Sequence, residues 1–229
     1  VTYLRTSGYK GQTLKYFKDN TKEDIRQGFE NILDWDILYS DDSDYNPDVD
    51  AKDEGFGALA IKKNNNIIIA FEGTSFNSTS SIWQDFVLTD LLVVGAGYDS
   101  LQVYGAYKFV ERVLNSDASK GCNIYITGHS LGGWLAQKVG GSILQGGVNL
   151  QDSNSEYYRA NQIPKYKQAE IASIYESTFR ARRNDIKKIV TYAAPGFYNH
   201  TKIYKNDSEV KGKVFNYKMK HDPISTVGR

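Results

Sequence analysis

Residues 127–133 read TGHSLGG, so one glycine lies two residues before Ser130 and another lies two residues after it. A short run rich in β-branched residues comes before the first glycine. The pattern Gly-x-Ser-x-Gly is typical of a nucleophilic serine when a strand precedes it and a helix follows it. The segment NIYIT (123–127) predicts the strand, and LGGWLAQKVGGSIL (131–144) predicts the helix. Ser130 would then stand on a sharp turn, where glycine is needed on both sides because strand and helix approach closely.

A serine nucleophile also needs donors for a negatively charged oxygen and an acid that orients a base. The backbone N–H of Leu131, at the start of the predicted helix, can face such an oxyanion, and the helix dipole adds to the attraction. Asp222 is the acid candidate, because it follows the predicted strand 213–219 and comes after the serine in chain order.

The general base is the hardest member of the site to assign, because none of the three histidines of the chain has the expected position. His129 is expected to pack or hydrogen-bond beneath the turn, and His221 is adjacent to Asp222, so their side chains should diverge. His200 precedes the aspartate, whereas the histidine of such a triad comes last. We therefore expect the base to lie beyond Arg229, with His200 as the fallback.

The segments around Ser130 predict a sheet with helices between its strands. A hairpin turn at 63–66 is expected to join the first two strands, and residues 101–115 carry apolar positions at helical spacing. The alternation favours an α/β fold with a mainly parallel sheet, in a single domain over residues 1–229. The further predicted strands are 55–62, 66–73, 187–194 and 213–219.

Three regions lie outside this core pattern. Residues 22–39 predict a helix, and residues 40–55 form an acidic stretch that does not match calcium-loop spacing, so we interpret it as a solvated loop. Residues 1–54 would thus be an N-terminal helical and acidic-loop extension. Residues 145–185 are polar and predict an excursion with one or two surface helices.

Composition excludes several classes of function. The formal net charge of +1 provides no field for binding nucleic acid, and no apolar run approaches the roughly 20 residues that span a bilayer. The single Cys122 cannot form an internal disulfide and is expected to be buried in a strand. No metal-ligand cluster or phosphate-binding loop is evident, so no cofactor is expected. The chain begins at Val1 without a signal segment, which suggests a piece of a longer protein.

The elbow sequence TGHSLGGWLAQ resembles that of the class 3 lipases, the fungal-type triacylglycerol lipase family and its bacterial relatives. Further segments resemble that family in the same order, so the resemblance covers roughly residues 55–229. It implies an α/β-hydrolase fold, with Ser130 as nucleophile, Asp222 as acid and Thr74 completing the oxyanion hole. The C-terminal part of that fold would be missing from this chain. The matching segments are IIIAFEGT (67–74), IWQDF (82–86), VTYAAPGF (190–197) and FNYKMKHDPIST (215–226).

The sequence departs from the family at Glu72, where an arginine is usual, and we interpret Glu72 as structural. Residues 75–92 correspond to the family's lid, and Asp85 matches an aspartate that we expect to be structural. Five apolar residues in this segment either form a cover over an acyl chain or, in the case of Trp83, Phe86 and Val87, belong to the core. They are Phe76, Ile82, Trp83, Phe86 and Val87.

The resemblance implies a lipase, phospholipase or esterase whose partner is an acyl ester or lipid, with transient contact at a lipid interface. A non-catalytic domain of the same fold, binding lipid or protein, is the alternative that Glu72 and the missing base favour. An acyltransferase using the same nucleophile is a third interpretation. Oligomeric state is not set by the sequence, and export as part of a larger bacterial protein is slightly favoured over the cytoplasm.

Overall fold

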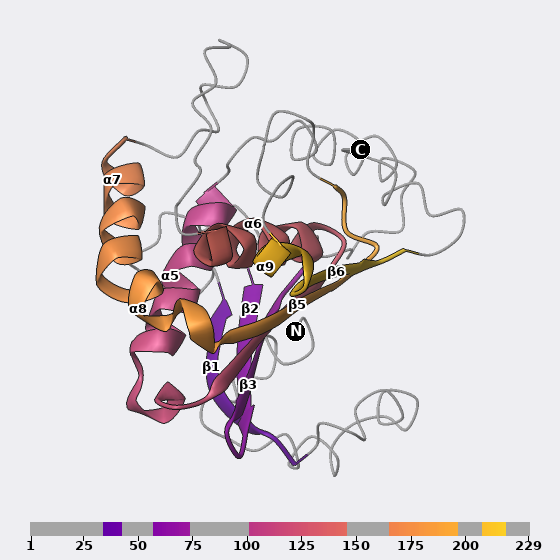
Figure 1. Ribbon diagram of the computed structural model, residues 1–229, viewed down its shortest axis with the longest axis horizontal. Helices are drawn as coiled ribbons and strands as arrows, with labels where there is room; N and C mark the ends of the chain where they lie inside the picture. The colour runs from indigo at the N-terminus through magenta and orange to yellow at the C-terminus, as the bar shows by residue number, and fades with distance from the viewer. Residues whose placement is uncertain (1–33, 43–56, 74–100, 146–164, 197–207, 219–229) are drawn as a thin grey trace.

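The computed structural model describes residues 34–42, 57–73, 101–145, 165–196 and 208–218 (Figure 1). The strands in these ranges are β1 (Asp36–Asp42), β2 (Gly57–Lys63), β3 (Asn66–Phe71), β4 (Asn123–His129), β5 (Ile186–Tyr192) and β6 (Val214–Tyr217). The helices are α5 (Leu101–Asn115), α6 (Leu131–Gln145), α7 (Lys165–Ile174), α8 (Arg180–Arg182) and α9 (Ser208–Lys211). Short helical turns complete them: η1 (Asp117–Ser119), the π-helical η3 (Tyr175–Phe179) and η4 (Arg183–Asp185).

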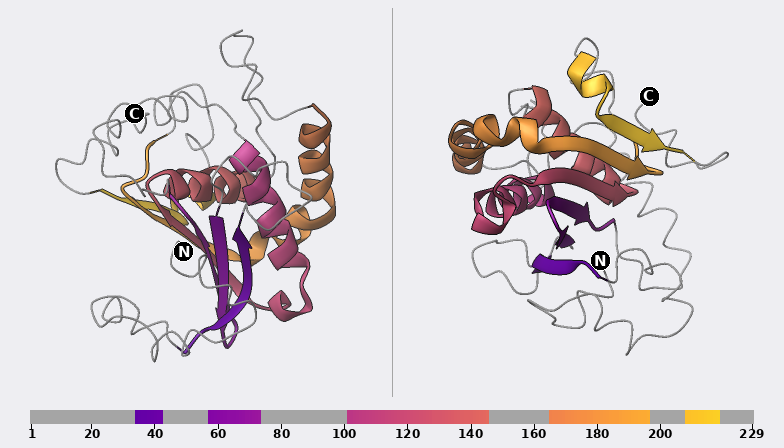
Figure 2. Two further views of the ribbon diagram at one scale, coloured as in Figure 1. Left: turned by 180° about the vertical axis from the view of Figure 1, so that it is seen from behind. Right: turned by 60° about the horizontal axis from the view of Figure 1, so that its bottom comes forward.

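The strands form one six-stranded sheet in the order β1-β2-β3-β4-β5-β6. The colours run across it from indigo β1 to yellow β6 in the right panel of Figure 2, so every strand pairs with its neighbour in the sequence. The pairs from β3 to β6 are parallel, whereas β1–β2 and β2–β3 are antiparallel. The α/β class is therefore confirmed, with parallel pairing limited to the half of the sheet that carries Ser130.

Connection length explains this division of the sheet. β2 and β3 are joined by a two-residue turn, which only antiparallel strands can use. Asn64 in this turn has a φ of 52°, a left-handed conformation that asparagine tolerates better than most residues. The parallel pairs β3–β4 and β4–β5 instead have α5 and α6 in their connections, as parallel crossovers require.

Helix α6 is the central helix of the core and lies against β3, β4 and β5. Its residues from Leu131 to Leu144 are all buried, which is expected of a helix whose apolar residues extend around its circumference. Small residues allow the close packing: a Cβ on Gly140 would lie 2.5 Å from Ile189 Cδ1. Trp134 is fully buried beside these contacts, and the core thus fixes how the start of α6 meets the sheet.

Helix α5 packs on α6, and α7 packs on α5 (Figure 1). The Tyr104 hydroxyl donates to Glu170 at 2.6 Å, and the Lys108 ammonium lies 2.9 Å from the same carboxylate. The hydrogen bond from Tyr104, and then the bond and charge of Lys108, lower the pKa of Glu170. The carboxylate therefore stays charged and ties α7 to α5 at neutral pH.

Two expectations from the sequence are corrected by the sheet. The predicted helix 22–39 is wrong at its end, because residues 36–42 form β1 and pair with β2 through the partners Ile37 and Ile61. Strand pairing overrides local helical spacing there. The excursion 145–185 is also more than surface helices, because Ile171, Ile174 and Phe179 are buried in the core.

Candidate functional site

Ser130 occupies the single residue between β4 and α6. Its φ is 54°, which lies in the left-handed region that costs a non-glycine residue roughly 1–3 kcal/mol. The side chain is buried, with only 2% of its surface exposed. The predicted strand, turn and helix around Ser130 are thus confirmed, and the turn holds its serine in a strained conformation.

The glycines of the turn are needed for close backbone contacts. A Cβ on Gly128 would lie 2.3 Å from the carbonyl carbon of Gly132, and a Cβ on Gly132 would lie 2.3 Å from the Phe71 carbonyl oxygen. Both distances are far below any real contact with backbone atoms. β4, the start of α6 and the end of β3 therefore meet at a point that admits no side chain at these two positions.

Backbone hydrogen bonds fix the turn on its other side. The Ser130 N–H donates to the Tyr192 carbonyl at the end of β5, at 3.0 Å. The Trp134 N–H donates to the Ser130 carbonyl at 3.1 Å, which closes the first turn of α6. A strained backbone conformation persists only where surrounding contacts hold the residue in place, and these two hydrogen bonds hold Ser130.

The start of α6 can stabilise negative charge beside Ser130. The first N–H groups of any helix have no partner within the helix, and Leu131 is the first residue of α6. The first turn contains no acidic side chain that would offset the positive end of the helix dipole. Leu131 is thus the first helical residue after Ser130, and its role as oxyanion donor stays a prediction.

The end of β3 also reaches the elbow, at Gly73. A Cβ on Gly73 would lie 3.6 Å from Ser130 Cβ and 2.8 Å from the His129 carbonyl oxygen, so glycine is required for this approach as well. Thr74, the other expected oxyanion residue, directly follows Gly73 but lies outside the described residues. The role predicted for Thr74 depends on the segment after β3, which approaches Ser130 at Gly73.

The position of the His129 side chain differs from the prediction. It is exposed at the end of β4 and does not pack beneath the turn. Side chains alternate between the two faces of a strand, and Gly128 faces α6, so His129 points to the opposite face. Its register partner on β5 is Tyr192.

Glu72, which stands where the resemblance predicts an arginine, is buried at the end of β3. Its N–H donates to the Gly57 carbonyl at 2.8 Å, continuing the β2–β3 pairing. A Cβ on Gly57 would lie 2.3 Å from Glu72 Oε2, so the missing side chain at Gly57 makes room for the carboxylate.

Several predicted site residues lie outside the described residues. They include the acid candidate Asp222 and the fallback bases His200 and His221. The segment 75–92, with Asp85 and the apolar residues expected to form a cover, also lies outside them. These assignments stay predictions.

Replacing Gly132 with alanine is expected to cost about 3 kcal/mol of stability and to displace the elbow, because its Cβ would overlap β3 backbone that cannot rotate away. Gly140→Ala in the same helix is the matched control. Its Cβ would meet the side chains of Ile189 and Ile126 rather than backbone, and better helix propensity offsets part of the crowding, so the loss should be about 1 kcal/mol, smaller than at Gly132. Urea denaturation of both variants measures this; equal losses would contradict the close approach at Gly132.

Among the parts of the chain that the structure describes, no group of three or more His, Cys, Asp or Glu side chains is arranged to hold a metal ion. Within the same parts, no helix is both long and apolar enough to cross a membrane. Cys122 is buried, as expected.

The described residues define an α/β protein with a mixed sheet and a strained serine at a strand-to-helix turn. No family model matches the chain, and no curated protein matches it. Among solved structures, the chain is similar to the extracellular lipase LipA from Serratia marcescens, with a TM-score of 0.38 and 18% sequence identity. The similarity covers 82% of this chain and 25% of the lipase, so the chain spans a quarter of that protein's length. Similarity at this level does not by itself assign an activity.

Proposed function

We propose that the chain is a serine ester hydrolase of α/β-hydrolase type, with Ser130 as its nucleophile. The observation that carries this proposal is the left-handed Ser130 at the joint of β4 and α6. A nucleophile elbow uses this conformation to present a hydroxyl where a strand meets a helix, and among the described residues with a positive φ other than glycine Ser130 is the one at such a joint.

In the proposed reaction, Ser130 Oγ attacks the carbonyl carbon of an ester while a histidine takes the hydroxyl proton. The N–H groups of Leu131 and Thr74 bind the oxyanion that forms. The histidine then protonates the departing alcohol, which leaves an acyl group on Ser130. Water hydrolyses this acyl-enzyme by the same steps, with Asp222 orienting the histidine throughout.

The substrate class proposed is a carboxylic ester, including lipid esters. This follows from the resemblance to class 3 lipases, which stays a prediction. The same acyl-enzyme would serve an acyltransferase, so analysis of the products with water and with added alcohol as acceptor separates the two activities.

Covalent labelling tests the nucleophile directly. A fluorophosphonate probe should release fluoride and form a phosphonate ester with Ser130 Oγ, which mass spectrometry of the peptide containing residue 130 would detect. Ser130→Ala should not be labelled. Ser142→Ala removes a buried serine from α6, the helix that follows Ser130, and should be labelled like the wild type. Absence of the adduct on Ser130 in wild-type protein that extends past Arg229, and so includes the expected base, would reject the proposal in favour of a non-catalytic binding domain.

A further inference from the structure

One peptide group links the nucleophile to the end of β6. The carbonyl of the Tyr192–Ala193 peptide accepts the Ser130 N–H at 3.0 Å, and the N–H of the same peptide donates to the Tyr217 carbonyl at 2.8 Å. A rigid peptide plane transmits rotation from one end to the other. The orientation of this plane therefore determines where the acceptor for Ser130 lies.

The residue after this plane is strained in the same way as the nucleophile. Ala193 has a φ of 48°, so two adjacent strands, β4 and β5, are each followed directly by a left-handed non-glycine residue. Without external contacts, Ala193 would relax to a negative φ and turn the preceding peptide. Contacts beyond Ala193 must therefore hold this conformation.

Ala194 is held from two sides. The Asn216 side chain on β6 donates from Nδ2 to the Ala194 carbonyl at 3.0 Å. Ala194 is fully buried, and a Cβ on Gly133 would lie 2.7 Å from Ala194 Cβ. The segment after β5 is thus clamped between the Asn216 amide and the first turn of α6.

Stability alone does not account for an asparagine at position 216. Within the part of the chain that the structure describes, Asn216 Oδ1 is buried and has no hydrogen-bond partner. A buried acceptor without a partner opposes folding, and an apolar side chain would avoid it. The benefit of the amide therefore lies in the one bond that it makes, to Ala194.

We propose that Asn216 is a positioning residue for Ser130, acting through Ala194, Ala193 and the Tyr192 carbonyl. The inference rests on the proposed function insofar as it predicts catalysis. It also makes a purely structural claim about the elbow, which does not depend on any activity. Loss of the amide frees the Ala194 carbonyl, lets Ala193 relax and removes the acceptor from the Ser130 N–H.

Asn216→Ala tests this chain of contacts in the full-length protein, with Asn216→Asp as an isosteric variant that lacks the N–H donor. Both should lower kcat for p-nitrophenyl butyrate by about 10- to 100-fold, as expected for a displaced nucleophile, with KM within about twofold of the wild type. Hydrogen exchange should show faster exchange of the Ser130 amide in both variants, while the β4 amides before it keep their protection.

Thr178→Ala is the matched control, because Thr178 Oγ1 donates to Asn115 Oδ1 at 3.1 Å, far from the elbow. It removes a comparable side-chain bond and should leave kcat unchanged. Ala193→Gly provides a rescue: glycine accepts a positive φ without strain, so Asn216→Ala/Ala193→Gly should recover most of the lost kcat.

The readouts separate this inference from the proposed function. Unchanged exchange at Ser130 together with unchanged kcat would overturn the positioning role and leave the hydrolase intact. If the wild type and all variants lack turnover, the proposed function fails, and exchange at Ser130 alone decides about Asn216. An equal fall in kcat in Thr178→Ala, or no recovery in the double variant, would also overturn the inference.

Discussion

Replacing Ser130 with alanine is expected to lower kcat for ester hydrolysis by roughly 10⁴- to 10⁶-fold, because the acyl-enzyme can no longer form. The variant should stay folded, since alanine keeps the Cβ and the backbone bonds to Tyr192 and Trp134 involve no side-chain atom of Ser130. Its free energy of unfolding should therefore change by no more than about 1 kcal/mol. Turnover of p-nitrophenyl esters and urea denaturation measure the two quantities.

Ser142→Ala is the control for this experiment. Ser142, in α6, is buried like Ser130, and its hydroxyl donates to the Lys138 carbonyl at 2.7 Å. Its loss costs one hydrogen bond and should leave kcat unchanged. If Ser130→Ala kept wild-type turnover, the elbow would not be the site of the chemistry.

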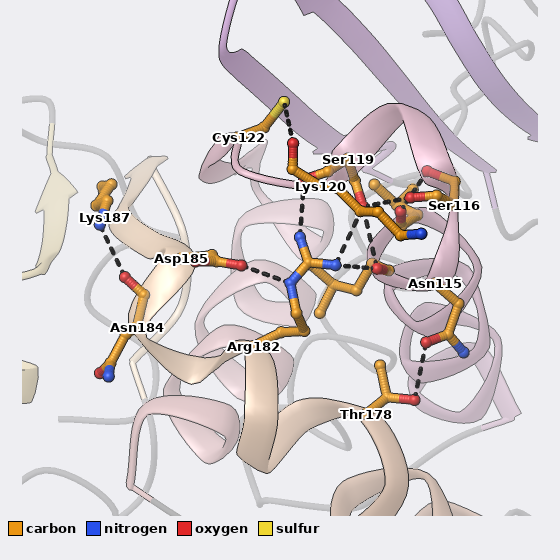
Figure 3. A network of polar contacts seen from close by, with 12 residues as sticks. Asn115, Ser116, Ser119, Lys120, Cys122, Thr178, Arg182, Asn184, Asp185 and Lys187 are labelled. Carbon is orange, nitrogen blue, oxygen red and sulfur yellow. Dashed lines mark hydrogen bonds and ion pairs between the residues drawn. The ribbon is translucent and has the colours of Figure 1, made fainter.

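A large effect on stability is also expected at Arg182, which joins three segments near the points where β4 and β5 begin (Figure 3). Its guanidinium donates to the carbonyls of Leu114 and Ser119, to the Ser119 hydroxyl and to Asp185. Leu114 lies in the last turn of α5, where carbonyls have no partner within the helix. Arg182 therefore caps α5 and fixes the connection from α5 to β4.

Arg182→Ala is expected to lower the free energy of unfolding by about 3 kcal/mol, because it leaves several partly buried acceptors without a charged donor. For a chain of this length, that corresponds to a fall in Tm of roughly 6–12 °C. Turnover per folded molecule should stay at the wild-type level, because the network is remote from Ser130.

Arg180→Ala provides the comparison, since Arg180 forms an exposed pair with Glu176 one turn away and lies 5.9 Å from the centre of the Tyr175 ring. Such a pair contributes about 0.5 kcal/mol. Similar losses in the two arginine variants would show that Arg182 does not have the capping role that its contacts indicate.

Much of the architecture follows from local sequence. The predicted helix 101–115 coincides with α5, and the hairpin and the strands on either side of Ser130 appear within two residues of their predicted limits. These elements have strong apolar periodicity or a turn residue that marks the boundary. The α/β class and the elbow at Ser130 follow from the same local signals.

Other features depend on contacts between distant segments. Residues 36–39 end the segment with helical spacing, and residues 40–42 begin the predicted acidic loop. Both parts form β1, because pairing with β2 satisfies their backbone and buries Ile37. The long segment 145–185 reads as polar, yet its helices bury one side in the core. In both segments the structure is decided by a partner element elsewhere in the chain, which the local composition does not reveal.

Local sequence patterns suffice to place Ser130 between a strand and a helix, with glycines where the backbone approaches closely. The bond from the Ser130 N–H to Tyr192, the left-handed conformation of Ala193 and the bond from Asn216 to the next carbonyl appear only in the folded sheet. The difference arises because glycine spacing and apolar periodicity are properties of residues close together in the chain. Parallel strands, by contrast, bring together residues more than 60 and 80 positions apart in the chain (130 with 192 and 217), and their register is set by the packing of the whole sheet.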